Sequence, residues 1–419
     1  MCDHIYMRTY QQKIIGKKLK MLKLFFDEQL EHIDKQTTKR KSKIHTNHLF
    51  CALASKGINN SSYEEVTVQL RKKKLIADVT ACAIHKKLNT GNYSIYLEQL
   101  IQKFTQLIDQ TTGKKQNVFA VDGTKINLSS SMKDHGFELV GCQRYCQGLV
   151  TTIFNINQQM PYYSLLSSNH DERISLYNLL LKIEPVNHTG KDLLIFDRGY
   201  FSLKMVDTMS RFNKDFVFRL PCSLTIIKEL IGMETDDHIF TSGQKQVRVI
   251  HYQKLNPKGK NISFFMGTSL FDKVIYPKSK IMDLYHSRWS IEEYYKKFKG
   301  QSKIGTNSAT YSIKPEMIHC ELLMRQFSIT LTQYITSMLH VQDGYKINYH
   351  VSSDTIINDI LPHLFIDKDP NHKTCHVAEM LNLLGIIADI IIKIRPDRSF
   401  PRKRIFPATK IYSDSKVNT

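Results

Sequence analysis

Residues 118–128 read VFAVDGTKINL, a stretch whose alternate positions are mostly apolar. Strand side chains repeat with a period of two, so one strand face would carry Val118, Ala120, Asp122, Thr124, Ile126 and Leu128. Asp122 is a carboxylate in the middle of a face that otherwise suits a core. Because an unpaired buried charge costs several kcal/mol, the stretch predicts a strand whose Asp122 is paired with a cation, hydrogen-bonded or protonated.

A second carboxylate ends another predicted strand. Leu193–Phe196 is a continuous apolar run, typical of a central strand buried on both faces, and Asp197 follows it directly. The remaining pattern predicts strands at 148–156, 160–167 and 216–220, and helices at 172–183 and 202–212. Because strands and helices alternate here, the sequence predicts an α/β fold.

The regions around this α/β stretch have other patterns. Residues 1–112 are predicted to be helical and basic, with two short helices around Asn89–Asn92 that suit either a DNA-binding helix-turn-helix or an ordinary helical hairpin. Residues 222–270 hold strand-like pieces between polar turns and predict a β-rich insertion. The expected division is therefore an N-terminal region at 1–112 for DNA-end binding, a catalytic core at 113–221 and 271–345, the insertion at 222–270, and a helical C-terminal region at 346–419 with a basic tail, a candidate for dimerisation.

The chain is strongly basic. Its 419 residues carry 59 Lys and Arg against 39 Asp and Glu, a formal net charge of +20, and the pI is near 9.4. This excess favours a polyanionic partner, with nucleic acid as the first candidate and an anionic membrane surface as the second. No apolar run reaches the roughly 18 residues that span a bilayer, which excludes an integral membrane protein. The eight scattered cysteines and the lack of a secretory signal favour a reducing compartment.

A third carboxylate lies on a predicted helix at 282–299. At 100° per residue, a stripe about 60° wide holds Tyr285, Arg288, Glu292 and Lys299, bordered by Lys296 and Trp289. The apolar stripe that should face the core comprises Leu284, Ile291, Tyr295 and Phe298. The first stripe places an acid among cations and hydrogen-bond donors. That suits a carboxylate that binds a metal while its neighbours bind phosphates, and a surface helix with ion pairs is the alternative.

The spacing Tyr285-x2-Arg288-x3-Glu292-x6-Lys299 resembles the signature of the DDE transposases of bacterial insertion sequences, in the group typified by insertion sequence four. VDGTKINL, with Asp122, and FDRGYFS, with Asp197, are similar to the other two family motifs and occur in the same order. The FMGTSL and RPDRSFPRKR stretches are similar too, so the resemblance covers roughly residues 115–410.

This resemblance implies an RNase H-like catalytic domain, a mixed sheet flanked by helices. Asp122 and Asp197 would lie on adjacent central strands, and the later helix would supply Glu292. The three carboxylates would bind two Mg²⁺ ions, with Mn²⁺ as a substitute, and catalyse cleavage at transposon ends followed by strand transfer into target DNA. The implied partners are terminal inverted repeats, target DNA and a second copy in a synaptic homodimer, in the bacterial cytoplasm at the nucleoid.

The family signature also implies DNA contacts. Tyr285, Arg288 and Lys299 would hold backbone phosphates, Arg288 by bidentate hydrogen bonding and Lys299 as a point charge. Further candidates for the DNA groove are Trp289, Lys296, Arg198 and Arg219, although Arg198 and Arg219 suit structural ion pairs equally well.

One feature departs from the family pattern. Well-studied relatives stack a flipped base on a Trp of the insertion, whereas the single Trp of this chain is Trp289, in the signature helix. Tyr252, Phe264 and Phe265 of the insertion are each either a stacking platform for a base or a core residue. Hairpin formation at the DNA ends is therefore left open.

Two other readings of the sequence remain open. The first is a catalytically silent DNA-binding relative that inhibits transposition or has been repurposed, and the second is a structure-specific nuclease on the same fold. All three acids and the complete helix signature favour an active transposase over the silent relative, and a nuclease would not need the long helical N-terminal region or the basic tail. His45-x2-His48-x2-Cys51 resembles half of a zinc site, but the sequence offers no matching second half.

Overall fold

The computed structural model describes residues 2–37, 44–59, 61–73, 75–76, 79–112, 117–140, 145–183, 191–233, 235–243, 245–255, 261–300, 314–366 and 373–394. The chain divides into two compact units, Thr105–Lys297, here the sheet unit, and Met1–Phe104 with Phe298–Thr419, here the helical unit. The RPDRSFPRKR stretch and the basic tail lie outside the described residues.

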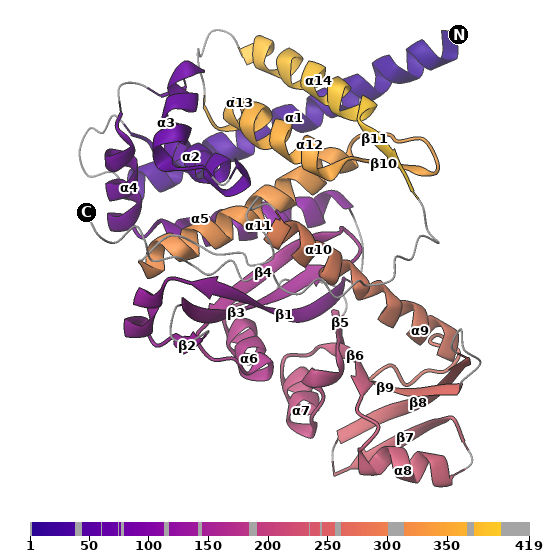
Figure 1. Ribbon diagram of the computed structural model, residues 1–419. Helices are drawn as coiled ribbons and strands as arrows, with labels where there is room; N and C mark the ends of the chain where they lie inside the picture. The colour runs from indigo at the N-terminus through magenta and orange to yellow at the C-terminus, as the bar shows by residue number, and fades with distance from the viewer. Residues whose placement is uncertain are drawn as a thin grey trace. The chain divides into compact units, whose positions relative to one another are not determined.

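The described strands of the sheet unit are β1 (Val118–Leu128), β2 (Glu138–Val140), β3 (Tyr145–Asn155), β4 (Met160–Ser167), β5 (Leu193–Phe196), β6 (Asp215–Leu220), β7 (Asp237–Ser242), β8 (Lys245–Leu255) and β9 (Asn261–Thr268). They form one mixed sheet in the order β2-β3-β1-β5-β6-β9-β8-β7, with β4 also paired to β3 (Figure 1).

Strand direction identifies the fold of this sheet. β3 runs antiparallel to both β1 and β4, whereas β1, β5 and β6 run parallel to one another. The series β4-β3-β1-β5-β6 with these directions is the sheet of an RNase H-like fold, so the predicted fold is confirmed. β9 pairs antiparallel with β6. The strands of residues 222–270 therefore continue the same sheet.

Helices connect and flank these strands, and two of them begin at a capping side chain. They are α6 (Glu172–Lys182), α7 (Leu203–Arg211), α8 (Thr225–Gly232), α9 (Lys278–Ser287) and α10 (Trp289–Gly300), with short 3₁₀ turns η1 (Ser130–His135) and η2 (Arg198–Tyr200). The Asp171 side chain accepts hydrogen bonds from the first backbone N–H groups of α6, and the Ser202 side chain does so for α7. These bonds satisfy donors that have no partner within the helix, which fixes where each helix begins.

The single helix predicted at 282–299 is wrong in one respect, because the helix breaks at Arg288 between α9 and α10. The Ser287 hydroxyl donates to the Leu284 carbonyl at 2.6 Å, the acceptor that the Arg288 N–H would use in a regular helix. The Arg288 N–H bonds the Tyr285 carbonyl instead, at 3.1 Å. A serine side chain that competes for a backbone acceptor in this way tightens and bends a helix.

The helical unit comprises α1 (Cys2–Thr37), α2 (Thr46–Asn59), α3 (Tyr63–Lys72), α4 (Ala81–Thr90), most of α5 (Tyr93–Thr112), α11 (Pro315–Ser337), α12 (Tyr349–Thr355), η3 (Ile356–Ile360), α13 (Leu361–Phe365) and α14 (Lys373–Asp389), with a small ribbon of β10 (Tyr345–Ile347) and β11 (Ile391–Lys393). Helices from both ends of the chain share one core. The buried Phe26 ring packs at centroid distances of 5.4, 5.8 and 5.0 Å against Phe104, Phe327 and Phe365.

The two predicted helices around Asn89–Asn92 are confirmed as α4 and α5. Asn92 has a φ of 49° at the turn between them, in the left-handed region that asparagine tolerates better than most residues. Most apolar side chains of α5, including Leu97 and Leu100, are buried. A DNA-binding role for this helix pair remains a prediction.

Candidate catalytic centre

Strand register brings the first two predicted acids together. β1 pairs parallel with β5 from Val118 opposite Leu193 to Val121 opposite Phe196, so the next residue on each strand is Asp122 and Asp197. Adjacent strands lie about 4.8 Å apart, and partners in a parallel pair project toward the same face of the sheet. The two aspartates therefore lie side by side at the carboxyl end of β5, on adjacent central strands as expected.

Helix α10 packs against this pair of strands. Its Tyr295 hydroxyl donates to the Asp122 backbone carbonyl at 2.7 Å, and the Tyr294 ring lies 5.5 Å from the ring of Phe154 on β3. Ile291, Tyr295 and Phe298 are buried as predicted, and Leu284 is half-buried. The core-facing stripe of this segment is thus largely confirmed, and it anchors the helix that carries Glu292.

Arg288 joins the third acid to the first. Its Nη2 donates to the Glu292 Oε1 at 2.8 Å, and its Nη1 lies 3.9 Å from the Asp122 Oδ2. The side chain is only about a tenth exposed. The break before α10 places Arg288 at the start of that helix, one turn from Glu292. The structure therefore directs the guanidinium toward carboxylates.

Tyr285 contacts the remaining aspartate. Its hydroxyl donates to the Asp197 Oδ1 at 3.2 Å, and the Arg288 guanidinium lies 5.6 Å from the centre of its ring. The guanidinium of Arg219 lies near enough to lower the pKa of this hydroxyl, although burial raises that pKa overall. Two residues of the helix signature thus contact all three predicted catalytic acids.

Burial and mutual repulsion make the charges of this cluster costly. Burial raises the pKa of Asp122 to about 6, and the charges of Asp197 and Glu292 add to the rise. Arg288 and the Gly123 N–H oppose the shift without cancelling it. For Arg288 itself, burial lowers the pKa, yet the neighbouring Tyr285 and aspartates raise it overall. The centre holds more negative charge than its one buried guanidinium compensates.

A fourth carboxylate, Glu172, belongs to this cluster and was not predicted. Its sequence pattern indicates only the start of a helix. Burial, together with the charges of Asp122 and Asp197, raises the pKa of Glu172 to about 6. In the sequence, Glu172 is marked only by its position directly after the N-cap Asp171. That position does not indicate which residues the first turn of α6 faces in the folded protein.

Two glycines make room for Glu172. A Cβ added to Gly123 would lie 3.0 Å from the Glu172 Oε1, and one added to Gly199 would lie 3.6 Å from the Oε2. These glycines follow Asp122 and Asp197 closely in the VDGTK and FDRGY motifs. The carboxylate therefore lies between the backbone segments that carry the two aspartates, and at Gly123 any larger residue would press against it.

A known protein family matches the part of the chain that carries these acids. The model of the transposase DDE domain matches residues 113–331, which is more than half of the chain. The chain belongs to the transposase DDE-domain family. No curated protein matches this family member. A solved structure of piggyBac transposase, in a synaptic complex with hairpin DNA, is similar over 92% of this chain and 87% of that chain, at 11% identity and a TM-score of 0.45.

The carboxylates of this DDE-family protein suit a hard cation. All four offer oxygen ligands, which Mg²⁺ prefers, and their repulsion creates a demand for positive charge. Among the described residues, however, they do not form a group of three with ligand atoms all within 4.8 Å. Mg²⁺ is usually held by one or two carboxylates together with substrate phosphates, so pairs of these acids fit it better than a closed cage.

Other predicted DNA contacts of this transposase-family chain lie on α10 and near Asp197. Trp289 is half exposed, and Lys296 lies 5.9 Å from its ring and forms an ion pair with Glu293. Lys299 is half-buried further along the helix. Arg198 and Arg219 are exposed at the ends of their elements. These placements leave Trp289, Lys296, Arg198 and Arg219 accessible within the sheet unit.

The aromatic residues of the insertion are packed with one another. The Tyr252 and Phe264 rings stack at 5.3 Å, and the Tyr252 hydroxyl donates to the Lys278 carbonyl. Phe265 is buried and stacks on His251. Each of these rings therefore has a structural partner within the sheet unit of the transposase-family fold.

Among the described helices, none is both long enough and apolar enough to cross a bilayer.

Proposed function

We propose that this protein is a Mg²⁺-dependent DNA transposase of the bacterial group typified by insertion sequence four. It cleaves transposon ends and joins the freed 3′-hydroxyls to target DNA in a cut-and-paste reaction. The observation that carries the proposal is the register of β1 and β5, which aligns Asp122 with Asp197 while α10 presents Glu292 to them through Arg288. Membership in the DDE-domain family supports the same chemistry.

Asp122, Asp197 and Glu292 are the proposed catalytic metal ligands, and Glu172 is a fourth carboxylate that supports them. When bound there, Mg²⁺ would supply activation of the attacking oxygen and stabilisation of the leaving oxygen in an in-line displacement. The chain itself holds its carboxylates in place. The backbone positions the two aspartates, Tyr285 orients Asp197, and Arg288 holds Glu292 beside Asp122.

The raised pKa values of Asp122 and Glu172 are consistent with this role. In the absence of a divalent cation, both carboxyls bind protons more readily than usual because their charges are buried together. A divalent cation favours their ionised forms, so metal binding releases protons from the centre. The affinity for Mg²⁺ should therefore fall as the pH drops below about 6.

DNA would approach along the exposed side of α10 and the carboxyl end of β5. Trp289 offers a ring for stacking, and Lys296, Lys299, Arg198 and Arg219 offer cations for phosphates. Tyr285 and Arg288 are proposed phosphate ligands from the family signature, and the carboxylates compete for both in this structure. A homodimer that synapses two transposon ends completes the proposal, and the net charge of +20 favours such a DNA partner.

The test is end cleavage in vitro. The substrate is a duplex that carries the inverted repeats flanking the gene, incubated with the purified chain and with Mg²⁺ or EDTA. Cleavage should require Mg²⁺, and Asp122→Asn and Glu292→Gln should each abolish it while the affinity for the duplex is retained. Glu293→Gln is the matched control, because Glu293 lies beside Glu292 but pairs with Lys296 on the exposed face. Binding without cleavage by the wild type would identify a catalytically silent relative instead.

A further inference from the structure

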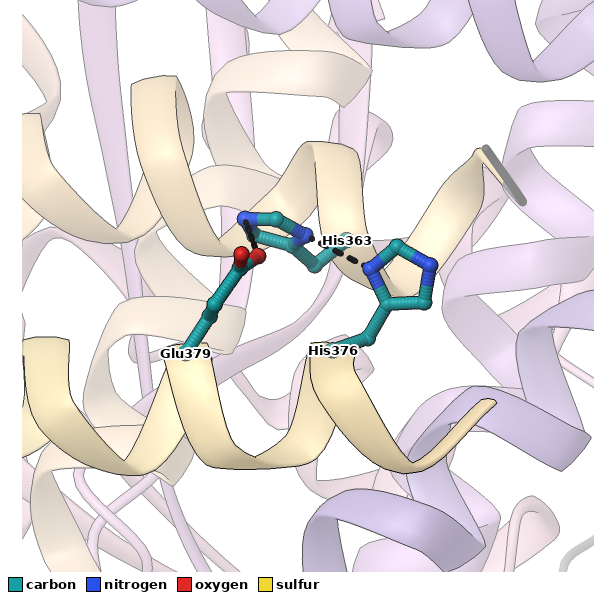
Figure 2. Close-up of side chains that lie close together, drawn as sticks. All are labelled: His363, His376 and Glu379. Atoms are coloured by element: carbon teal, nitrogen blue, oxygen red, sulfur yellow. Dashed lines mark hydrogen bonds and ion pairs between the residues drawn. The ribbon is translucent and has the colours of Figure 1, made fainter. Parts of the chain in front are cut away.

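Two histidines and a glutamate converge in the helical unit, outside the proposed catalytic centre. His363 lies on α13, while His376 and Glu379 lie one turn apart on α14 (Figure 2). The Nδ1 atoms of the two imidazoles are 3.2 Å apart, and the Nε2 of His363 is 3.3 Å from the Glu379 Oε2. Figure 2 shows the His363 ring between the other two side chains.

The three residues form a compact set of metal ligands. One ligand atom from each residue can be chosen so that all three lie within 4.8 Å of one another, and no other described group of three does this. Zn–N and Zn–O bonds of about 2.1 Å place neighbouring ligands of a tetrahedral ion about 3.4 Å apart. The two short contacts use opposite nitrogens of the His363 ring, so binding of one ion requires the ring or the Glu379 side chain to turn until a single nitrogen faces both partners.

Burial also suits a bound ion. His376 is 8% exposed and the His363 side chain 14%, whereas half of the Glu379 side chain is exposed. The imidazoles thus lie in the protein interior, where ring nitrogens are oriented by packing. The carboxylate lies at the surface, where an ion can enter and a water molecule can complete its coordination.

We propose that His363, His376 and Glu379 form a structural site for a divalent transition metal, with Zn²⁺ as the preferred ion. Two imidazole nitrogens and one carboxylate favour Zn²⁺ over Mg²⁺, which prefers oxygen ligands. The ion would tie α13 to α14. Both helices pack against α1, so one ion would fasten the N-terminal helix to the C-terminal part of the same unit.

The site is independent of the proposed transposase chemistry. Its ligands belong to the helical unit, whereas the four carboxylates of the candidate catalytic centre belong to the sheet unit. The ligand sets differ as well, since the catalytic centre contains only oxygen donors. Zinc binding can therefore be measured without any DNA substrate.

The experiment uses the full chain, stripped with EDTA and desalted into buffer with millimolar Mg²⁺ to occupy carboxylate sites. Zn²⁺ is then titrated, and bound metal is counted by elemental analysis. The wild type should retain one Zn²⁺ per chain, with a Tm raised by at least about 3 °C. Co²⁺ in place of Zn²⁺ should give the visible absorption of a tetrahedral site.

The variants are His363→Asn, Glu379→Gln and the control His340→Asn, which changes an exposed histidine of the same unit. The first two should weaken Zn²⁺ binding by at least about tenfold and lose the Tm increase, and the control should retain both. The Glu379 side chain is half exposed, so Glu379→Gln should leave folding intact. This variant therefore still tests the proposal if His363→Asn fails to fold. Absence of retained Zn²⁺ in the wild type, or equal binding by Glu379→Gln, would overturn the proposal.

Discussion

The two clusters of ionisable side chains differ in how they balance charge. The candidate catalytic centre sets the carboxylates of Asp122, Asp197, Glu292 and Glu172 against one buried guanidinium, so its members repel one another. The histidine cluster sets two imidazoles beside a single carboxylate and carries no such excess. In the first arrangement the mutual repulsion would be relieved by the proposed Mg²⁺ ions, and the second suits the proposed structural ion. Removing a carboxylate from the candidate catalytic centre should therefore lower activity and raise stability. Removing a ligand from the histidine cluster should lower stability and leave activity unchanged.

The largest expected effect is on the cleavage rate, which should depend on the candidate catalytic centre and not on the histidine cluster. Asp197→Asn should lower Mg²⁺-dependent cleavage by at least about 10³-fold, because a metal ligand is lost. His363→Asn should leave the cleavage rate within about twofold at a temperature well below its Tm, since the histidine cluster belongs to the helical unit and the proposed catalytic carboxylates belong to the sheet unit. Single-turnover cleavage assays measure both, and a large loss of cleavage with folded His363→Asn would show that the two clusters act together.

The fourth carboxylate gives the next largest effect. Glu172→Gln removes a charge next to the two aspartates while keeping the side-chain shape, and cleavage should fall by about 10- to 100-fold. The apparent affinity for Mg²⁺, measured from the metal dependence of the rate, should fall with it. Glu293→Gln again serves as the control. An unchanged rate and metal dependence would reduce Glu172 to a structural residue of α6.

Substitution of Arg288 tests whether its guanidinium mainly positions the carboxylates or mainly binds DNA phosphates. Arg288→Lys keeps the charge, but a single ammonium group cannot contact both Glu292 and Asp122 as the guanidinium does. We expect cleavage to fall about tenfold with little change in DNA affinity. If instead the affinity falls and its salt dependence flattens, Arg288 acts mainly as a phosphate ligand.

The smallest expected effect is on the stability of Asp122→Asn. This variant should be more stable than the wild type although it should lose cleavage. The pKa of Asp122 is raised to about 6 in the folded protein, so its protonated form stabilises the fold at low pH and this contribution is lost as the pH rises through about 6. Without divalent metal at pH 7.5, Asp122→Asn should therefore be more stable by about 1–3 kcal/mol.

The gain from Asp122→Asn should disappear near pH 4, where the wild-type carboxyl is protonated in the folded state. Thermal unfolding at the two pH values measures the difference. A variant that is destabilised at pH 7.5 would mean that the attraction of Asp122 to Arg288 outweighs its burial and repulsion.

In the histidine cluster, His376→Asn should lower the Tm of the zinc-loaded chain at pH 7.5.

Much of the sheet unit followed from local sequence. The apolar runs at 160–167 and 193–196 coincide with β4 and β5. In β1 the predicted alternation of burial holds from Thr124 to Leu128, whereas both faces are buried over 119–121. Periodicity predicts such elements because each side chain's direction depends only on its position along its own strand or helix. The three acids were singled out for the same reason, since each is a charge on an otherwise apolar element or within a regular helical stripe, and their proposed catalytic role came from the resemblance of the surrounding motifs.

Tertiary structure decided everything that depends on meetings between distant segments. The register of β1 against β5 aligns Asp122 with Asp197, and the approach of α6 brings Glu172 to Gly123. A hydrogen bond from Ser287 breaks the helix before Glu292, which turns Arg288 toward the acids. His363 and His376 meet only because α13 and α14 pack together. The sequence by itself therefore determined the elements and their charged faces, whereas the packing of those elements determined which of the charged side chains lie close to one another.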